Sequence, residues 1–499
     1  MYTSPAKMLQ RRLCLGLAKS GHANGGVTTL RTNGCKHYST NGARPARSIL
    51  RPQVIALSLG IGFGATWWAT RSRSDQNTLS QSEEPPRLED APLTHLMVDP
   101  GFSDDEVTRT LAQGSFTRRV TKIAGVDRYD GAQLASNSPC EDRYVHGSFS
   151  SPANEGKSWM AWGVFDGHAG WQTAELLKNQ LPTFVRQSLS EAGSQTDDTT
   201  VQKSIVKGFL NLEDLIIKTA LEQAQSDAPL RQKIKNLAPA FAGSCALLSL
   251  YDPTTRSLHV ACTGDSRAVL GRRVEDGKWE AIALSVDQTG SNEAEVARIN
   301  NEHPSETEIA KGGRVLGIMV SRAFGDSRWR YPLEVQEDLM RRFYGPALLT
   351  PRYDVRTPPY LTAEPVVTTT KIEAGRPSFL IMASDGLWDM LSNQEAVDMV
   401  GRWIESQGPG SKRAEQESTP IKERWDFSRY WKDGDWKFET EKTTPVDGNP
   451  AVHLIRGSLG GDNKDLVAAR LAFTSPESRR VRDDITVQVV FFEGSARRE

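Results

Sequence analysis

The chain has 499 residues, of which 38% are hydrophobic and 25% are charged. This globular composition can bury a sizeable core, either as two or three average domains or as one large domain with insertions. Residues 1–74 contain eleven Lys or Arg and no acid, so residues 75–499 carry 50 basic against 62 acidic side chains, a net charge of −12. Such an acidic body argues against nucleic-acid binding, because a phosphate backbone attracts a basic surface.

Residues 1–51 are predicted to be a mitochondrial presequence. They contain no Asp or Glu and are rich in Arg, Ser, Thr and Gly, and five Met or Leu side chains alternate with basic ones between Lys7 and Lys19. A positively charged amphipathic segment without acids is what such targeting signals require. The alternative is a basic tail that has no targeting role.

Residues 52–70 form an uncharged, apolar stretch between two arginines. At about 1.5 Å per residue, a helix of this length spans roughly 28 Å, close to the thickness of a bilayer core. Trp67 and Trp68 would lie at one membrane interface. We therefore expect a single transmembrane anchor or stop-transfer element of the inner membrane, with a matrix-targeting extension as the alternative. Residues 71–94 are polar and are expected to be a linker.

The body begins with a helix, followed by a strand that leads into a polar turn. Ser103 and the three acids after it predict a helix start, because Ser caps the first turn and acids complement the helix dipole. The apolar run Trp159–Phe165 predicts a buried strand that ends at Asp166. A helical run begins at Trp171 and should end before Pro182, because proline lacks a backbone donor and clashes with the preceding turn.

Later elements alternate between groups of short strands and helices. Short apolar runs separated by turn residues predict an antiparallel meander rather than βαβ units. Helical runs between them predict sheets with helices packed on their outer faces. The expected strands are Ser244–Tyr251, Leu258–Thr263, Ala268–Arg272 and Trp279–Leu284, and the expected helices are Ile205–Leu221, Glu293–Asn301 and Gln394–Glu405.

Isolated acids recur beside the strand-like runs of the body. These are Glu141-Asp142, Asp166, Asp265, Asp385 and Asp483-Asp484. Each alone is more typical of a turn or a helix cap, but their repetition at strand ends indicates one shared site. Carboxylates without a Cys or His cluster favour a hard divalent cation, Mg²⁺ or Mn²⁺, over zinc.

The chain resembles the metal-dependent PP2C/PPM protein phosphatases in seven ordered motifs: CEDRY (140–144), VFDGHAG (164–170), AGSCALL (242–248), TGDSRAVLG (263–271), SRAFGD (321–326), ASDGLWD (383–389) and RDDITV (482–487). The resemblance covers residues 95–493 and leaves residues 494–499 as a tail. It implies an α+β fold with a central β-sandwich of two antiparallel sheets flanked by α-helices. Residues 327–363 resemble the flap beside the family's active site. Residues 407–450 are read as an inserted surface loop whose three Trp leave a docking role open.

The resemblance also implies two Mg²⁺ or Mn²⁺ ions and a weaker third, with metal-binding residues Glu141, Asp142, Asp166, Gly167, Asp265, Asp385 and Asp483. Asp166 bridges the first two ions, and Asp142 supports their ligands. The third ion is expected between Asp265 and Asp385. Asp484 is more typical of a supporting residue than of a ligand. Two such ions can activate a shared water for attack on phosphorus.

His168, two residues after Asp166, is the candidate acid that protonates the leaving oxygen, since only His titrates naturally near neutral pH. A structural His at a turn is the alternative. Most members of the family clamp the substrate phosphate with an Arg four residues before the motif Glu, and here that position is Asn137. We therefore expect Asn137 at the substrate site, with Arg143 or Arg322 compensating for the missing cation.

Within the family, the segments NSPCEDR (137–143), RTPPYLTAEP (356–365) and AVHLIR (451–456) resemble the mitochondrial pyruvate dehydrogenase phosphatases and their fungal relatives. The sequence therefore predicts a mitochondrial serine/threonine phosphatase that acts on pyruvate dehydrogenase E1, in the matrix or at the inner membrane. One alternative is an anchored phosphatase of the intermembrane space with another phosphoprotein substrate. The other is an inactive adaptor, which would be expected to have a broken carboxylate set, whereas the set here is complete.

Overall fold

The computed structural model describes residues 102–152, 154, 156–193, 197–408 and 443–492. The expected presequence, transmembrane stretch and linker lie outside these residues, as do the tail and most of the 407–450 insertion. Among the helices of the described residues, none is long and apolar enough to cross a membrane.

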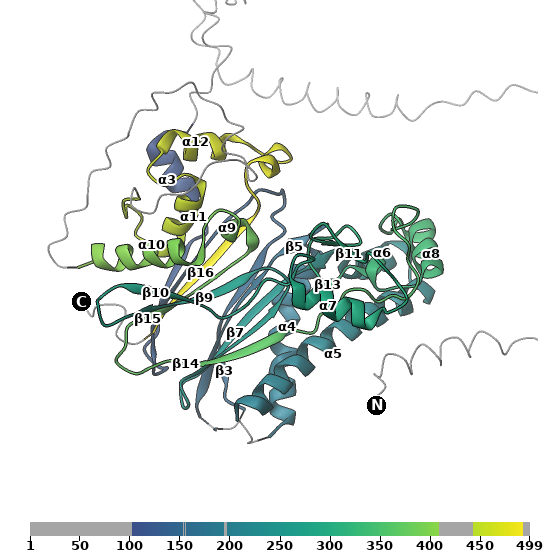
Figure 1. Cartoon of the computed structure of the whole chain (residues 1–499), viewed down its shortest axis with the longest axis horizontal. Coiled ribbons are helices and arrows are strands. Elements are labelled where there is room, and N and C mark those ends of the chain that lie inside the picture. The colour runs from purple at the N-terminus through teal and green to yellow at the C-terminus, as the bar shows by residue number, and fades with distance from the viewer. Residues whose placement is uncertain (1–101, 153, 155, 194–196, 409–442, 493–499) are drawn as a thin grey trace, which may run out of the picture. The chain divides into compact units, whose positions relative to one another are not determined.

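Two antiparallel sheets form the centre of the body (Figure 1). One is six-stranded, in the order β1 (Phe116–Arg119), β2 (Val126–Leu134), β16 (Ile485–Phe492), β15 (Ser378–Ala383), β9 (Arg267–Arg273) and β10 (Trp279–Ala283). The other is five-stranded, in the order β14 (Val366–Lys371), β8 (Ser257–Thr263), β7 (Ala246–Asp252), β4 (Ser158–Phe165) and β3 (Arg143–Ser150). The predicted sandwich of two antiparallel sheets is confirmed.

Side chains of the central strands alternate between two cores. In β4, Met160, Trp162 and Val164 pack between the two sheets, whereas Trp159 and Phe165 face the helices outside the five-stranded sheet. Successive side chains of a strand point to opposite faces, so a strand that is covered on both faces needs apolar residues throughout. This explains why the sequence here is a continuous apolar run rather than an alternating one.

Helices cover the outer face of each sheet (Figure 1). Over the five-stranded sheet lie α4 (Gln172–Glu191), α5 (Asp198–Gln225) and α6 (Leu230–Phe241). Over the six-stranded sheet lie α3 (Asp104–Ala112), α9 (Asp385–Trp388), α10 (Asn393–Ser406), α11 (Pro450–Leu459) and α12 (Lys464–Ala472). The predicted start of α3 is confirmed: Ser103 Oγ accepts from the Glu106 amide at 3.3 Å, and the Glu106 carboxylate accepts from the Ser103 amide at 2.9 Å.

The prediction that the helix after Trp171 ends before Pro182 is wrong. α4 continues through Pro182 to Glu191, and its buried residues on both sides of the proline, such as Leu177 and Val185, belong to the core outside the five-stranded sheet. Burial of this apolar face outweighs the one backbone hydrogen bond that proline cannot donate, because tertiary packing supplies most helix stability in proteins.

The expected single meander over residues 244–284 is also wrong. The four predicted strands form, but β8 and β9 belong to different sheets. The connection between them, which contains Asp265, therefore passes from one sheet to the other. This places Asp265 at the rim of the sandwich, where strand ends from both sheets meet.

The remaining described elements surround that rim. A small three-stranded sheet has the order β13 (Phe324–Gly325), β6 (Gly243–Ser244) and β5 (Gly167–His168). Beyond it lie α7 (Glu293–Glu302), β11 (Ala310–Lys311), β12 (Arg314–Val315), η3 (Ser327–Trp329) and α8 (Leu333–Phe343), and η6 (Glu477–Arg480) precedes β16. The segment predicted as a flap is thus folded, with Trp329, Leu349, Tyr360 and Leu361 buried in a small core that it shares with α7 and the residues around β11 and β12.

Candidate active site

The acids predicted to share a site converge at one end of the sandwich. Asp166 follows β4, Asp265 lies between β8 and β9, Asp385 begins α9 after β15, and Asp483 precedes β16. Asp166, Asp265 and Asp385 each offer one oxygen within 4.8 Å of the other two. Together with Asp483 and His168 they line a pocket of about 740 Å³.

The electrostatics of this pocket fit a divalent cation. Burial raises the pKa of Asp166 well above its ordinary value of 3.8, and repulsion from Asp385, Asp142 and Asp265 raises it further. Burial likewise raises the pKa of Asp265. Carboxylates this close destabilise one another's charged forms, and a bound cation reverses that effect. The donors are all oxygens, which suits Mg²⁺ or Mn²⁺.

Glu141 is held at the edge of the pocket by its loop. The buried carboxylate of Asp484 accepts hydrogen bonds from the amides of Ser136, Asn137 and Glu141, at 2.5, 2.8 and 2.7 Å. On the other side, a Cβ added to Gly167 would lie 2.4 Å from the carbonyl oxygen of Glu141. Only glycine allows the backbones on either side of the site to approach this closely, and Asp484 supports the loop that carries Glu141.

Asp142 lies behind the pocket, where it connects three of the converging segments. Its Oδ2 accepts hydrogen bonds from Ser384 Oγ at 2.8 Å and from Thr486 Oγ1 at 2.7 Å. Burial, followed by repulsion from Asp484, raises its pKa to about 7. Because Ser384 precedes Asp385 and Thr486 follows Asp483 closely, Asp142 fixes the backbone around both acids.

His168 is held by Asp326, a residue that the sequence analysis did not single out. The small sheet places β5 and β13 on either side of β6, so Nε2 of His168 lies 2.7 Å from Oδ2 of the buried Asp326. A Cβ at Gly243 would lie 2.1 Å from this Nε2 and 2.3 Å from this Oδ2, so the pair requires glycine there. Burial lowers the pKa of His168, but the charge and hydrogen bond of Asp326, together with the charges of Asp265 and Glu141, raise it by more, so the net pKa is raised above the ordinary value of 6.5.

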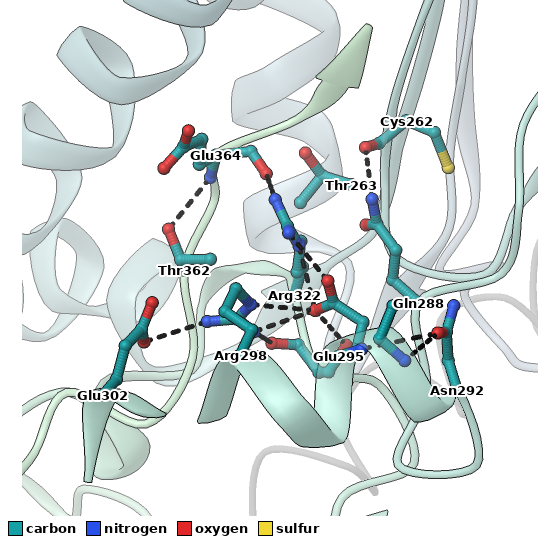
Figure 2. Close-up of polar contacts among 12 residues, drawn as sticks. Cys262, Thr263, Gln288, Asn292, Glu295, Arg298, Glu302, Arg322, Thr362 and Glu364 are labelled. Atoms are coloured by element: carbon teal, nitrogen blue, oxygen red, sulfur yellow. Dashed lines mark hydrogen bonds and ion pairs between the residues drawn. The ribbon is translucent and has the colours of Figure 1, made fainter. Parts of the chain in front are cut away.

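Arg322, expected to contact substrate, is instead part of a buried ion network (Figure 2). Its Nε and Nη2 donate to the two carboxylate oxygens of Glu295 at 3.0 and 2.7 Å, and its Nη1 donates to the Glu364 carbonyl at 2.7 Å. Arg298 and Ser321 also donate to Glu295. Arg322 is not among the residues that line the pocket. Its ion pair with Glu295 instead joins α7 to the segment that carries Asp326.

The other two expected substrate contacts are also engaged within the fold. Arg143 donates from Nε to Glu175 at 2.5 Å and from Nη1 to the carbonyls of Cys140 and Asp142 at 2.7 Å. Asn137 donates from Nδ2 to Asp484 at 2.9 Å. The arginines that line the pocket are Arg314, Arg328 and Arg479, and none of them was predicted from the sequence to contact substrate.

Comparison with known proteins identifies the family. The model of the family described as protein phosphatase 2C matches residues 132–423. A protein phosphatase 2C homologue of Schizosaccharomyces pombe is 40% identical over 403 residues, covering 79% of this chain and 86% of that protein. The chain belongs to the protein phosphatase 2C family, whose members depend on metal ions. It is a protein serine/threonine phosphatase.

Two relatives carry a more specific name. The mitochondrial pyruvate dehydrogenase [acetyl-transferring] phosphatase 1 of Saccharomyces cerevisiae is 37% identical over 427 residues, covering 79% of this chain and 73% of that protein. The mitochondrial phosphatase 2 of the same kind from Homo sapiens is 30% identical over 470 residues, covering 81% and 85%. The resemblance to the pyruvate dehydrogenase phosphatases is thereby confirmed.

Proposed function

We propose that this protein is a mitochondrial phosphatase that uses Mg²⁺ or Mn²⁺ to remove phosphate from serine or threonine of pyruvate dehydrogenase E1. The observation that supports the chemistry is the group of carboxylates around Asp166. The names and the high coverage of the yeast and human relatives support the substrate and the compartment. In this proposal residues 1–51 are the presequence, and residues 95–493 form the phosphatase domain.

The metal-binding roles are those that the resemblance to the family implies, and the convergence of Asp166, Asp265 and Asp385 supports them. Asp166, the Gly167 carbonyl and Glu141 would hold one cation, and Asp166 with Asp385 and Asp483 a second. Asp265 and Asp385 would hold a weaker third. Two bound divalent cations supply charge neutralisation and an activated water for in-line attack on phosphorus. Asp142 and Asp484 keep the ligand-bearing loops in register through the hydrogen bonds described above.

His168 delivers a proton to the leaving oxygen of serine or threonine. That oxygen is strongly basic, so proton transfer in the transition state accelerates its departure. Nε2 of His168 lies 2.7 Å from Oδ2 of Asp326. This contact fixes the ring plane, and the charge of Asp326 raises the pKa of His168. Asp326 is thus a positioning residue that acts through His168.

The test uses the full-length protein with phosphorylated pyruvate dehydrogenase E1 and, in parallel, a phosphothreonine peptide of unrelated sequence. Each is assayed with Mg²⁺, with Mn²⁺ and with EDTA. We expect metal-dependent release of phosphate from both, with E1 preferred. Turnover of the peptide without E1 would overturn the proposed substrate, and absence of turnover in saturating Mn²⁺ would overturn the proposed chemistry. Protease protection of the protein in intact mitochondria and in mitoplasts distinguishes the matrix from the intermembrane space.

A further inference from the structure

Arg479 lies at the wall of the active-site pocket, beside the acids proposed to hold metal. Its Nη1 donates to Asn137 Oδ1 at 3.1 Å and lies 3.6 Å from Glu141 Oε2, and its Nη2 donates to Asp483 Oδ2 at 3.2 Å. Its side chain is 45% exposed and forms part of the pocket lining. The guanidinium of Arg479 therefore lies between Glu141 and Asp483 and faces the pocket.

The contacts of Arg479 differ from those of an arginine that is committed to a carboxylate. Arg322 pairs with both oxygens of Glu295 through two of its nitrogens, and its side chain is only 10% exposed. Arg479 instead makes one hydrogen bond each to Asn137 and Asp483, from different nitrogens, and a longer ion pair of 3.6 Å to Glu141. The side chain of Arg479 is therefore held in place, is exposed to solvent and forms no bidentate pair with a carboxylate. Its guanidinium can still bind a phosphate through two hydrogen bonds.

The backbone around Arg479 is anchored to the loop that carries Asn137. Ser478 Oγ donates to the Ser136 carbonyl at 2.6 Å, and Ser136 Oγ donates to the Arg482 carbonyl at 2.9 Å. These bonds hold η6 against the loop from both sides. A binding group that is supported in this way keeps its geometry when substrate arrives.

The other two arginines of the lining have different surroundings. Arg314 donates to the Gly317 carbonyl, and Arg328 donates to the Ala347 carbonyl and stacks over the ring of Trp329 at 4.1 Å. Arg328 belongs to the segment of the predicted flap, whereas Arg314 lies in β12. Among the described residues, the hydrogen bonds of these two arginines go to backbone carbonyls and not to Glu141, Asp166, Asp385 or Asp483. Arg479 is thus the pocket-lining arginine that contacts acids proposed as metal ligands.

We infer that Arg479 binds the phosphoryl group of the substrate. The pocket is lined by acids that repel a phosphate dianion, so a cation fixed at their margin favours binding in addition to any metal ion. Arg479 supplies the positive charge that is missing at Asn137 and that was expected from Arg143 or Arg322. It contacts Asn137 although it lies 342 residues further along the chain. This inference rests on the proposed phosphatase function.

The experiment compares the full-length wild type with Arg479→Gln, Arg479→Lys and the control Arg480→Gln, which removes an exposed neighbouring charge. Calorimetry measures binding of inorganic phosphate in the presence of Mn²⁺ and, separately, binding of Mn²⁺ alone. We expect Arg479→Gln to weaken phosphate binding and raise the KM for a phosphothreonine peptide by about 10- to 100-fold, the effect of one charge-assisted hydrogen-bonded pair. Arg479→Lys should fall between this variant and the wild type, and Arg480→Gln should stay within about twofold of the wild type.

Two results would overturn the inference. One is unchanged phosphate affinity in Arg479→Gln. The other is a loss of Mn²⁺ affinity as large as the loss of phosphate affinity, because Arg479 would then act only by orienting Asp483 and Glu141. Failure of the proposed function is distinguishable: the wild type would turn over no phosphopeptide, while the calorimetric comparison among the variants would still report on Arg479.

Discussion

The two charged clusters of this phosphatase are built in opposite ways. Around Glu295, burial raises the pKa of the carboxylate, but hydrogen bonds from Arg322 and Arg298 lower it by more, to about 2. Around Asp166, burial raises the pKa and the neighbouring carboxylates raise it further. The charge of the first cluster is compensated by arginines of the protein itself, whereas the charges of the second would be compensated by the divalent cations proposed to bind there.

This difference separates residues that stabilise the fold from residues that bind. A buried charge with its counter-ion already in place has little to offer a ligand, because a ligand would have to break the existing pair. Like charges held close together in a pocket destabilise the folded protein, and a bound ligand of opposite charge removes this repulsion. Arg322 and Arg479 both contact carboxylates, but Arg322 forms a buried bidentate pair, whereas the contacts of Arg479 with Asp483 and Glu141 are single and exposed in the pocket.

The largest effect is expected from Asp166→Asn. A neutral amide bridges two cations poorly, so kcat on a phosphothreonine peptide should fall by at least about 10³-fold. In EDTA the same variant should melt at a higher temperature than the wild type, because one of the mutually repelling carboxylates is gone. Asp276→Asn, at an exposed hairpin position, is the control. Turnover near the wild-type value would contradict the metal assignment.

Arg322→Met should mainly damage the fold. It leaves Glu295 without its bidentate partner, and breaking a buried pair costs about 3–5 kcal/mol. Urea denaturation should show this loss in the free energy of unfolding, while the KM of the remaining folded enzyme changes little. Arg479→Gln should show the reverse pattern, with stability kept and KM raised. A stable Arg322→Met protein with a strongly raised KM would show that Arg322 binds substrate and does not stabilise the fold, contrary to the roles assigned here to the two arginines.

The pH dependence of stability provides a third comparison. The pKa of Glu295 is about 2 in the fold against an ordinary value of 4.5. Its contribution, roughly 3–4 kcal/mol at most, is therefore fully present above pH 4.5 and is lost as the pH falls towards 2. The free energy of unfolding of Glu295→Gln should accordingly decline less steeply over this window than that of the wild type. Parallel declines in the two proteins would refute the assigned pairing.

Asp326→Asn should have the smallest effect of the four. It removes the charge that positions His168 and raises its pKa, so kcat on a phosphothreonine peptide should fall by about 10- to 100-fold. p-Nitrophenyl phosphate has a leaving group that needs little protonation, so its hydrolysis should fall much less. Equal losses on both substrates would indicate a structural role for Asp326 rather than one through His168.

Local sequence was sufficient to predict antiparallel strands with helices outside them, the strand β4 and the acids at strand ends, whereas the sandwich of two sheets was predicted from the resemblance to the family. Apolar runs and the polar residues that end them are properties of neighbouring residues, and the fold preserves them. The partner of each arginine was not predictable, because Arg322 meets Glu295 and Arg479 meets Asn137 only through tertiary structure. Asp326 was missed for the same reason, since a small sheet formed by three distant segments brings it to His168. The prediction of a helix end before Pro182 was wrong because packing of the apolar face of α4 outweighed the local effect of the proline.

The most direct test of the central claim is a calorimetric titration of the full-length wild type and of Asp166→Asn with Mn²⁺, with the melting temperature measured before and after. The account predicts that Mn²⁺ binds the wild type and raises its melting temperature, since a ligand that binds only the folded state stabilises it. It also predicts that Asp166→Asn loses most of this binding. Mn²⁺ binding of equal strength in both proteins, or no binding in either, would contradict the assignment of these carboxylates as the metal site.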